Sequence, residues 1–333
     1  MAATIYDVAA LAGVSPATVS RVLNGSVVSP EKTEKVHAAV AALDFRPSRT
    51  ARTLRRRSSE IIALIIPDVE NTFFTALARG VEDRAVDAGL SVVLCNTDED
   101  PAKEARYLDI AVAEQMAGVV LAPASPQPDL VPFATRRIPV VLVDRRVADP
   151  GVDLVALDDE EASARATAAL FDRGYRRVGC ITGRADSPTA PLRAAGWRRV
   201  VEERSPDTDP ADYLRFTDYR PGGARGAAAE LLEMPRPPDA LFAANNLLGV
   251  GALAYLVEIG HRPPAVGLAA LGDLPYPEWE AEGVVVQPWP GRLLGVKAAD
   301  LLLARIRGDT SPRRTLVLRS DAAEAPAAAP TRS

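Results

Sequence analysis

Residues 4 to 25, TIYDVAALAGVSPATVSRVLNG, decide the fold of the N-terminal part of the chain. Thr4 can cap a first helix, and an acidic residue stands three positions on, at the spacing of a capping box. Gly13 breaks the apolar helical repeat where a tight turn is needed. Ser15 can cap a second helix that begins at Pro16, where a missing N–H costs nothing. The segment therefore predicts two short helices joined by a turn.

The second predicted helix turns small or hydroxyl-bearing side chains and one arginine outward. Small residues allow close approach to a DNA groove, hydroxyls can bond phosphates, and arginine can bond a guanine edge with two hydrogen bonds. The spacing alone leaves open a capped helical hairpin with no ligand. The outward residues are Pro16, Ala17, Thr18, Ser20 and Arg21.

Charge is distributed unevenly along the 333 residues, whose total net charge is −5. Residues 1–59 carry nine Lys or Arg and four Asp or Glu, a net charge of +5, so the rest of the chain carries −10. A basic head on an acidic body is typical of a protein that contacts DNA through the head alone. A solvated basic linker is the alternative.

The N-terminal motifs resemble the signature of the LacI/GalR family of bacterial transcriptional regulators, and the resemblance extends over nearly the whole chain. It is carried by Asp7-Val8-Ala9, Gly13-Val14-Ser15 and the run from Thr18 to Gly25. It implies a cytoplasmic repressor that binds a palindromic operator in double-stranded DNA as a homodimer, with a tetramer left open, under control of a sugar-like effector. No cofactor, metal or membrane contact is expected. The DNA contacts implied are Thr4, Ser15, Pro16, Ala17, Thr18, Ser20, Arg21, Asn24, Arg49, Arg52, Leu54 and Arg55.

The arginine-rich segment 46–59 contains one large apolar residue, Leu54. A helix this short with this many arginines should not hold in water, and should form only when phosphates and a partner segment neutralise and cover it. The resemblance identifies it as a hinge helix whose leucine wedges into the minor groove at the operator centre.

Beyond residue 60, strand-like runs alternate with helical segments, a pattern that predicts parallel sheets with helices on both faces. Two clusters, before and after about residue 159, predict two similar subdomains. Strands are expected at 61–66, 90–95, 118–122, 139–143, 178–182, 240–243, 265–270 and 284–286. Helices are expected at 73–88, 103–115, 160–172, 192–204, 223–233 and 246–259.

The resemblance implies an all-α helix-turn-helix head joined by a hinge helix to an α/β, periplasmic-binding-protein-like core of two doubly wound subdomains. The chain should cross between the subdomains three times, with a helix at 291–307 returning to the first and a strand at 315–319 to the second. The expected divisions are 1–45 for the head, 46–59 for the hinge, 60–320 for the core and 321–333 for a disordered tail. Within the core, the subdomains are expected at about 60–159 plus 290–312, and 160–289 plus 313–320.

Ligands in open α/β sheets bind beyond the carboxyl ends of the strands, so loop residues there are the candidates for an effector site. The resemblance places an arginine and an aspartate, Arg193 and Asp273, as the charged groups on which effector affinity depends. For the two phenylalanines, a place in the core is the alternative. The candidates are Phe73, Phe74, Asp144, Arg193, Tyr219, Asn245, Asp273 and Gln287.

Two departures from the family pattern bear on the ligand. The family has Asn-Asp where this chain has Asn245-Asn246, and Gly272 stands where the family has an acid that bonds the effector. Either the effector is not a typical sugar, or Asp273 takes the role, or the ligand response is weakened. Loss of this acceptor predicts weak or no binding of simple neutral hexoses.

Other classes of protein fit less well. A solute-binding receptor for transport is the alternative function, but it predicts a signal peptide and no basic head. An enzyme predicts a nucleophile with a base, metal ligands or a phosphate loop, and no such motif occurs. Cys95 and Cys180 lie in apolar runs and are expected to be reduced core residues. A glycine pair, Gly249 and Gly251, imitates a dinucleotide fingerprint but lies in an apolar helix, which indicates close packing.

Overall fold

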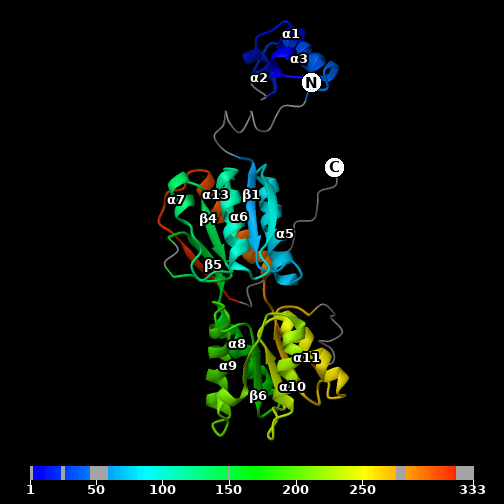
Figure 1. Ribbon diagram of the computed structural model, residues 1–333, viewed down its shortest axis with the longest axis vertical. Helices are drawn as coiled ribbons and strands as arrows, with labels where there is room; N and C mark the ends of the chain where they lie inside the picture. Colours follow the sequence, from blue (N-terminus) through cyan, green and yellow to red (C-terminus); the bar gives the residue numbers. More distant parts are fainter. Residues whose placement is uncertain (1–2, 24–26, 46–58, 149–150, 275–282, 320–333) are drawn as a thin grey trace. The chain divides into compact units, whose positions relative to one another are not determined.

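A computed structural model places the chain in two separately packed units, Met1–Ser59 and Glu60–Ser333. Each unit is described by itself (Figure 1). The residues that the structure describes are 3–23, 27–45, 59–148, 151–274 and 283–319.

The head is a bundle of three helices, α1 (Ile5–Ala12), α2 (Pro16–Leu23) and α3 (Pro30–Ala42). The buried side chains of its core are all alanine or valine, and Leu23, Leu43 and Phe45 are among the partly buried residues packed against them. The buried members are Val8, Ala9, Ala12, Val19, Val22, Val36 and Ala39.

The predicted caps of the first two helices are confirmed. Thr4 Oγ1 accepts from the backbone N–H of Asp7 at 3.4 Å, and Asp7 Oδ2 accepts from the backbone N–H of Thr4 at 2.8 Å. Gly13 ends α1 with a φ of +64°, a left-handed conformation that favours glycine. Ser15 Oγ accepts from the N–H of Thr18 at 3.2 Å, and α2 begins at Pro16 as predicted. Ser29 precedes α3 but makes no side-chain cap.

The first subdomain of the core is built on a parallel six-stranded sheet of order β11-β5-β4-β3-β1-β2. Helices α5 and α13 pack on one face, and α6 and α7 lie on the other (Figure 1). Its elements are β1 (Ile61–Ile66), α5 (Thr72–Asp87), β2 (Ser91–Asn96), α6 (Pro101–Ala113), β3 (Gly118–Leu121), α7 (Val131–Arg136), β4 (Val140–Val143), β5 (Asp153–Leu157), α13 (Gly291–Ile306) and β11 (Thr315–Leu318).

The second subdomain has a parallel five-stranded sheet of order β10-β9-β8-β6-β7. Helices α8 and α9 pack together, as do α10 and α11. Its elements are α8 (Asp159–Asp172), β6 (Val178–Thr182), α9 (Ala190–Arg204), the 3-10 helix η1 (Pro210–Tyr213), β7 (Leu214–Phe216), α10 (Pro221–Leu232), β8 (Ala240–Ala243), α11 (Asn246–Glu258), β9 (Gly267–Leu271) and β10 (Val285–Gln287).

One expected placement is wrong. The strand at 315–319 does not join the second subdomain, because β11 pairs in parallel with β5 in the first sheet. The turn after α13 is short, so the chain returns directly to the edge of the sheet on which that helix packs. Arg305 on α13 fixes this return by a two-pronged ion pair with Asp153 of β5, at 2.8 and 2.9 Å.

Glycines allow helices to pack closely within both subdomains. A Cβ on Gly295 of α13 would lie 2.1 Å from the carbonyl oxygen of Leu77 on α5, so any side chain there would separate the two helices. The predicted close packing at Gly249 and Gly251 is confirmed, since a Cβ on Gly251 would lie 2.1 Å from the carbonyl oxygen of Pro221. Both glycines are buried in α11.

Both cysteines are free thiols, but only one of them occupies the predicted place in the core. Cys180 lies in the core, where burial raises the pKa of its thiol, and Cys95 is half-buried on β2. Among the described helices, none is both long and apolar enough to cross a membrane.

Candidate functional site

The outer face of α2 exposes residues of the predicted DNA-reading surface, whose contact with DNA stays a prediction. Ala17 and Arg21 are exposed, while Val19 and Val22 on the opposite side are buried in the head. Ser15 Oγ and Thr18 Oγ1 lie 2.9 Å apart and are hydrogen-bonded to each other at the start of the helix. A small exposed residue at the first turn and an exposed arginine one turn later fit the approach of a helix to base edges.

The remaining predicted DNA contacts fall into two groups. Thr4 is exposed at the start of α1, and Pro16 and Ser20 are half-buried on α2. The other predicted contacts lie outside the described residues and stay predictions; these are Asn24, Arg49, Arg52, Leu54 and Arg55.

The core contains a cavity of about 350 Å³ lined by residues from both subdomains. Its walls are loops that follow the carboxyl ends of strands, the position expected of a ligand site in parallel sheets. Of the eight predicted effector contacts, six line the cavity: Phe73, Phe74, Asp144, Arg193, Tyr219 and Asn245.

Arg193 on α9 connects the two walls at the floor of the cavity. Its Nε donates to Asp159 Oδ1 at 2.7 Å, and one Nη donates to the carbonyl of Ala244 at 2.8 Å. Its second Nη lies 3.9 Å from Asp144 Oδ1 on the opposite wall. Burial disfavours the charge of this guanidinium, but the two carboxylates outweigh burial and leave its pKa above the ordinary value.

The two carboxyls beside Arg193 also have raised pKa values, but for an acid this shift disfavours the charged form. Burial raises the pKa of Asp159 to about 6, against the attraction of Arg193, and it also raises the pKa of Asp144. Of these two acids, Asp144 lines the cavity, where burial disfavours its charged form and the nearby arginines favour it.

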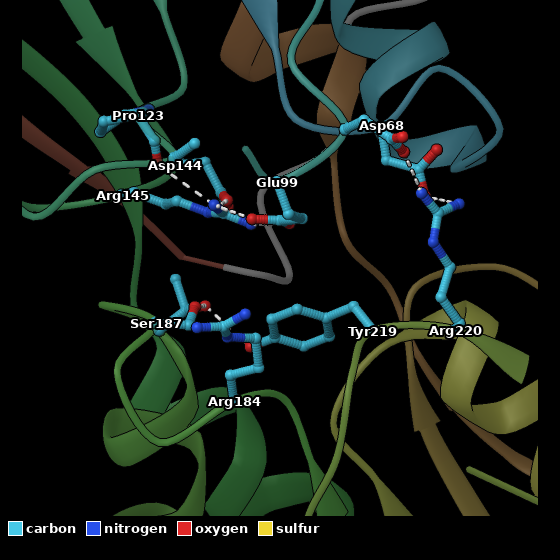
Figure 2. A network of polar contacts seen from close by, with 12 residues as sticks. Asp68, Glu99, Pro123, Asp144, Arg145, Arg184, Ser187, Tyr219 and Arg220 are labelled. Atoms are coloured by element: carbon cyan, nitrogen blue, oxygen red, sulfur yellow. Dashed lines mark hydrogen bonds and ion pairs between the residues drawn. The ribbon is translucent and has the colours of Figure 1, made fainter. Parts of the chain in front are cut away.

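Arg145, next to Asp144, is held in place by hydrogen bonds within the first subdomain. Its two Nη atoms donate to the carboxylate oxygens of Glu99 at 2.7 and 2.5 Å, and Nη1 also donates to the carbonyl of Pro123 at 3.1 Å (Figure 2). Glu99 has a φ of +58° and Asp144 a φ of +64°, both left-handed. Non-glycine residues adopt this conformation rarely, and they do so mainly where neighbouring contacts hold them.

Two buried polar atoms of the cavity wall have no hydrogen-bond partner among the described residues. They are Asp144 Oδ1, an acceptor, and Arg145 Nε, a donor. Leaving such groups unpaired costs about 1–3 kcal/mol each, so they are expected where a ligand supplies the partner.

Aromatic rings form the apolar part of the wall. The rings of Phe73 and Phe74 meet edge to face with centroids 4.9 Å apart, and Phe74 is buried, so it belongs to the core as well as to the lining. Tyr219 shares a hydrogen bond of 2.9 Å with Thr189. The guanidinium of Arg193 lies 5.1 Å from the ring centre of Trp289 and 6.0 Å from that of Tyr219.

Asp273 and Gln287 do not line the cavity. β9 ends at Leu271, and Gly272, with a φ of +84°, is the lining residue, so the next side chain, Asp273, is exposed elsewhere. Gln287 closes β10 through its backbone carbonyl, which accepts from the N–H of Gly272 at 2.9 Å. Trp289, two residues on, occupies the wall instead.

Sequence reasoning also missed lining residues that signals in the chain could have indicated. Arg145 directly follows Asp144, and Asp68 and Asn71 lie in the same loop as the predicted phenylalanines. Arg220 follows Tyr219, but nothing in its local sequence indicates that it spans the cavity.

A helix-turn-helix unit and a two-subdomain core with a polar cavity together define a DNA-binding regulator that responds to a ligand. Residues 4–48 match the family described as bacterial regulatory proteins, lacI family. Residues 59–324 match the family described as periplasmic binding proteins and sugar binding domain of LacI family. The chain therefore belongs to the LacI family of transcriptional regulators, which are not enzymes.

Curated relatives align with this chain over almost their whole length. The HTH-type transcriptional regulator KdgR of Bacillus subtilis (strain 168) is 31% identical over 95% of this chain and 94% of its own. The ribose operon repressor of Escherichia coli (strain K12) is 32% identical over 95% of this chain and 97% of its own.

Solved structures show the same architecture. The lac repressor dimer bound to operator and the anti-inducer ONPF matches with a TM-score of 0.81 at 25% identity, over 95% of this chain and 96% of that one. A complex of the transcriptional regulator CelR with cellobiose matches with a TM-score of 0.69 at 27% identity, over 95% and 97%.

Proposed function

We propose that this protein is a repressor that binds a two-fold symmetric operator as a homodimer and is controlled by a sugar-like effector in the cavity of its core. The observation that carries the effector part is the floor of the cavity. There the buried acceptor Asp144 Oδ1 lacks a hydrogen-bond partner, and the guanidinium of Arg193 lies 3.9 Å from it. A hydroxyl placed between them can donate to the carboxylate and accept from the arginine.

The walls suit a compact ligand with an apolar face and several hydroxyls. Phe73, Tyr219 and Trp289 offer rings to that face, while the floor offers acceptors and donors to the hydroxyls. Gly272 leaves its part of the wall without a carboxylate, so simple neutral hexoses are expected to bind weakly or not at all. A hexose complex of micromolar affinity would contradict that expectation.

The edge strand β2 of the first sheet is the surface we assign to the homodimer. Val93 and Leu94 on this strand are 40% and 44% exposed, and Val86 on the neighbouring α5 is 64% exposed. An exposed apolar edge strand is a liability unless another chain covers it. A second copy is the favoured occupant, because the lac repressor that this chain resembles in structure was solved as a dimer. Leu94→Asp should therefore shift sedimentation toward the monomer, and an unchanged dimer would exclude this surface.

A DNA-binding head favours a cytoplasmic location, where the chromosome is accessible. Selection of bound sequences from a random duplex pool tests the DNA part of the proposal. The expected result is enrichment of a palindromic site, because one short helix reads few bases and a dimer reads them twice. Enrichment of a single unsymmetric site would contradict it.

Thermal unfolding with a panel of sugars and polyols tests the effector part. A ligand at about 100 times its Kd adds about 2.7 kcal/mol of stability, which raises the melting temperature by several degrees. Asp144→Asn keeps the shape of the side chain and tolerates the left-handed backbone, but loses the charged acceptor, so its shift should shrink. Asp273→Ala is the matched control and should shift like the wild type, since Asp273 lies outside the cavity. Equal shifts in all three proteins would place the ligand elsewhere.

A further inference from the structure

Arg220 reaches from the second subdomain to three carboxylates of the first. It stands at the start of α10, and its Nη1 lies 3.0 Å from Asp68 Oδ2 and 3.2 Å from Glu70 Oε2. Its Nη2 lies 2.5 Å from Asp98 Oδ1. Figure 2 shows the Arg220 side chain extended across the cavity toward Asp68. One side chain therefore joins the loops after β1 and β2 to the opposite wall.

The acceptors are arranged so that they need a cation from across the cavity. Asp68 is 5% exposed, and burial raises the pKa of its carboxyl although a backbone N–H and Arg220 oppose this. Asp98 has a φ of +58° and pairs with Lys103 at 3.5 Å as well as with Arg220. The ion pair of Asp68, in contrast, is with Arg220. If the walls separated, Asp68 would face two neighbouring carboxylates without that cation.

Between the described residues of the two walls, a neutral hydrogen bond and a longer ion pair also cross the cavity. Asn246 Nδ2 donates to Thr72 Oγ1 at 2.7 Å, a hydrogen bond without charge. Arg193 approaches Asp144 only to 3.9 Å, and its short contacts are to Asp159 and Ala244 of its own subdomain. The short contacts of the Arg220 side chain therefore all lie on the far wall, while its backbone N–H bonds to Asp218.

We propose that Arg220 is a positioning residue that holds the two walls of the cavity together before any ligand binds. That this closure serves the response to an effector rests on the proposed function of the cavity. The closure itself does not depend on that function. The cluster is partly exposed, with Arg220 34% and Glu70 79% exposed. Salt screens such pairs, so ionic strength sets how often the cavity opens.

Hydrogen exchange of the full-length protein without ligand, followed by mass spectrometry, measures this opening. Amides of residues 66–74 and 243–248, on the two walls, should exchange about tenfold faster in Arg220→Ala than in the wild type. Raising the salt from about 50 mM to about 500 mM should accelerate the same amides in the wild type and have less effect in the variant. Arg220→Lys, which keeps the charge without the two-pronged geometry, should fall between them.

Arg225→Ala is the matched control. Arg225 also lies on α10 and pairs with Glu258 on α11, so its ion pair stays within one subdomain. This variant should leave exchange on both walls unchanged. If Arg220→Ala and the wild type exchange alike, or if Arg225→Ala accelerates both walls as much, Arg220 does not hold the cavity closed. Since no effector is used, failure here is distinguishable from failure of the ligand screen.

Discussion

The head and the core hold their functional polar groups in opposite ways. On the head, Arg21 projects into solvent from a helix of eight residues. In the core, Arg193 is 5% exposed and is bonded to an acid and a carbonyl. The exposed arginine of the head forms its contacts only when DNA binds. The buried arginine of the core already fixes the shape of its site before a ligand binds. The difference predicts that changes in the core cost folding stability, while changes in the head cost only DNA affinity.

Arg193→Ala should give the largest effect. It leaves the buried carboxyls of Asp159 and Asp144 without the cation between them, and breaking a buried pair in this way costs about 3–5 kcal/mol of unfolding free energy. Urea unfolding at neutral pH measures it. Arg204→Ala, at the end of the same helix, removes an exposed pair with Asp172 and should cost at most about 1 kcal/mol. Equal losses in the two variants would show that the core site is no more preorganised than the surface.

A second test of the core uses pH. Burial raises the pKa of Asp159 to about 6 from 3.8, so the folded protein holds a proton that the unfolded chain has released between these values. The stability linked to this proton is complete below about pH 4 and is lost as pH rises through 6, by about 3 kcal/mol. Asp159→Asn cannot titrate, so the difference in unfolding free energy between wild type and variant should change over this range. Asp172→Asn, which alters an exposed acid, should follow the wild type, and a constant difference for Asp159→Asn would refute the shift.

The same contrast explains how much the sequence could predict. The head follows from contiguous signals, since Thr4, Gly13 and Ser15 act within three or four residues of the groups they satisfy. In the core, alternation of strands and helices predicts the layers, and the family resemblance indicates six of the lining residues. Contacts across the cavity join distant segments of the chain, as in Arg220 with Asp68, 152 residues apart. Local pattern cannot predict such pairs, nor that Gly272 would turn Asp273 out of the wall, nor that β11 would pair with β5.

On the head, Arg21→Ala should weaken binding to the selected operator by about 1–3 kcal/mol, the contribution of a two-pronged contact with a base. Binding to random DNA should change little. Gel-shift titration on both duplexes decides this, with thermal unfolding as the check that the fold is intact. An equal loss on both duplexes would mean that Arg21 contacts phosphate.

Leu54→Ala tests the segment that connects the two regions, which lies outside the described residues. Leu54 is the only large apolar residue between Phe45 and Ile61, and it stands among arginines, where a solvated linker has no use for it. A minor-groove wedge unstacks a base step at a cost of a few kcal/mol and recovers it through the bend and the added contacts. The variant should therefore lose about tenfold in operator affinity, together with DNA bending in a circular-permutation gel assay.

The control for Leu54→Ala is the operator itself. Substitutions at its central base step should weaken the wild type more than the variant, because deformability is read there without base contacts. Dimerisation and the thermal shift with an effector should stay as in the wild type, since both belong to the core. A variant that binds and bends DNA like the wild type would reduce the segment to a tether. The head would then bind DNA without help from the hinge, and the two regions would be coupled by proximity alone.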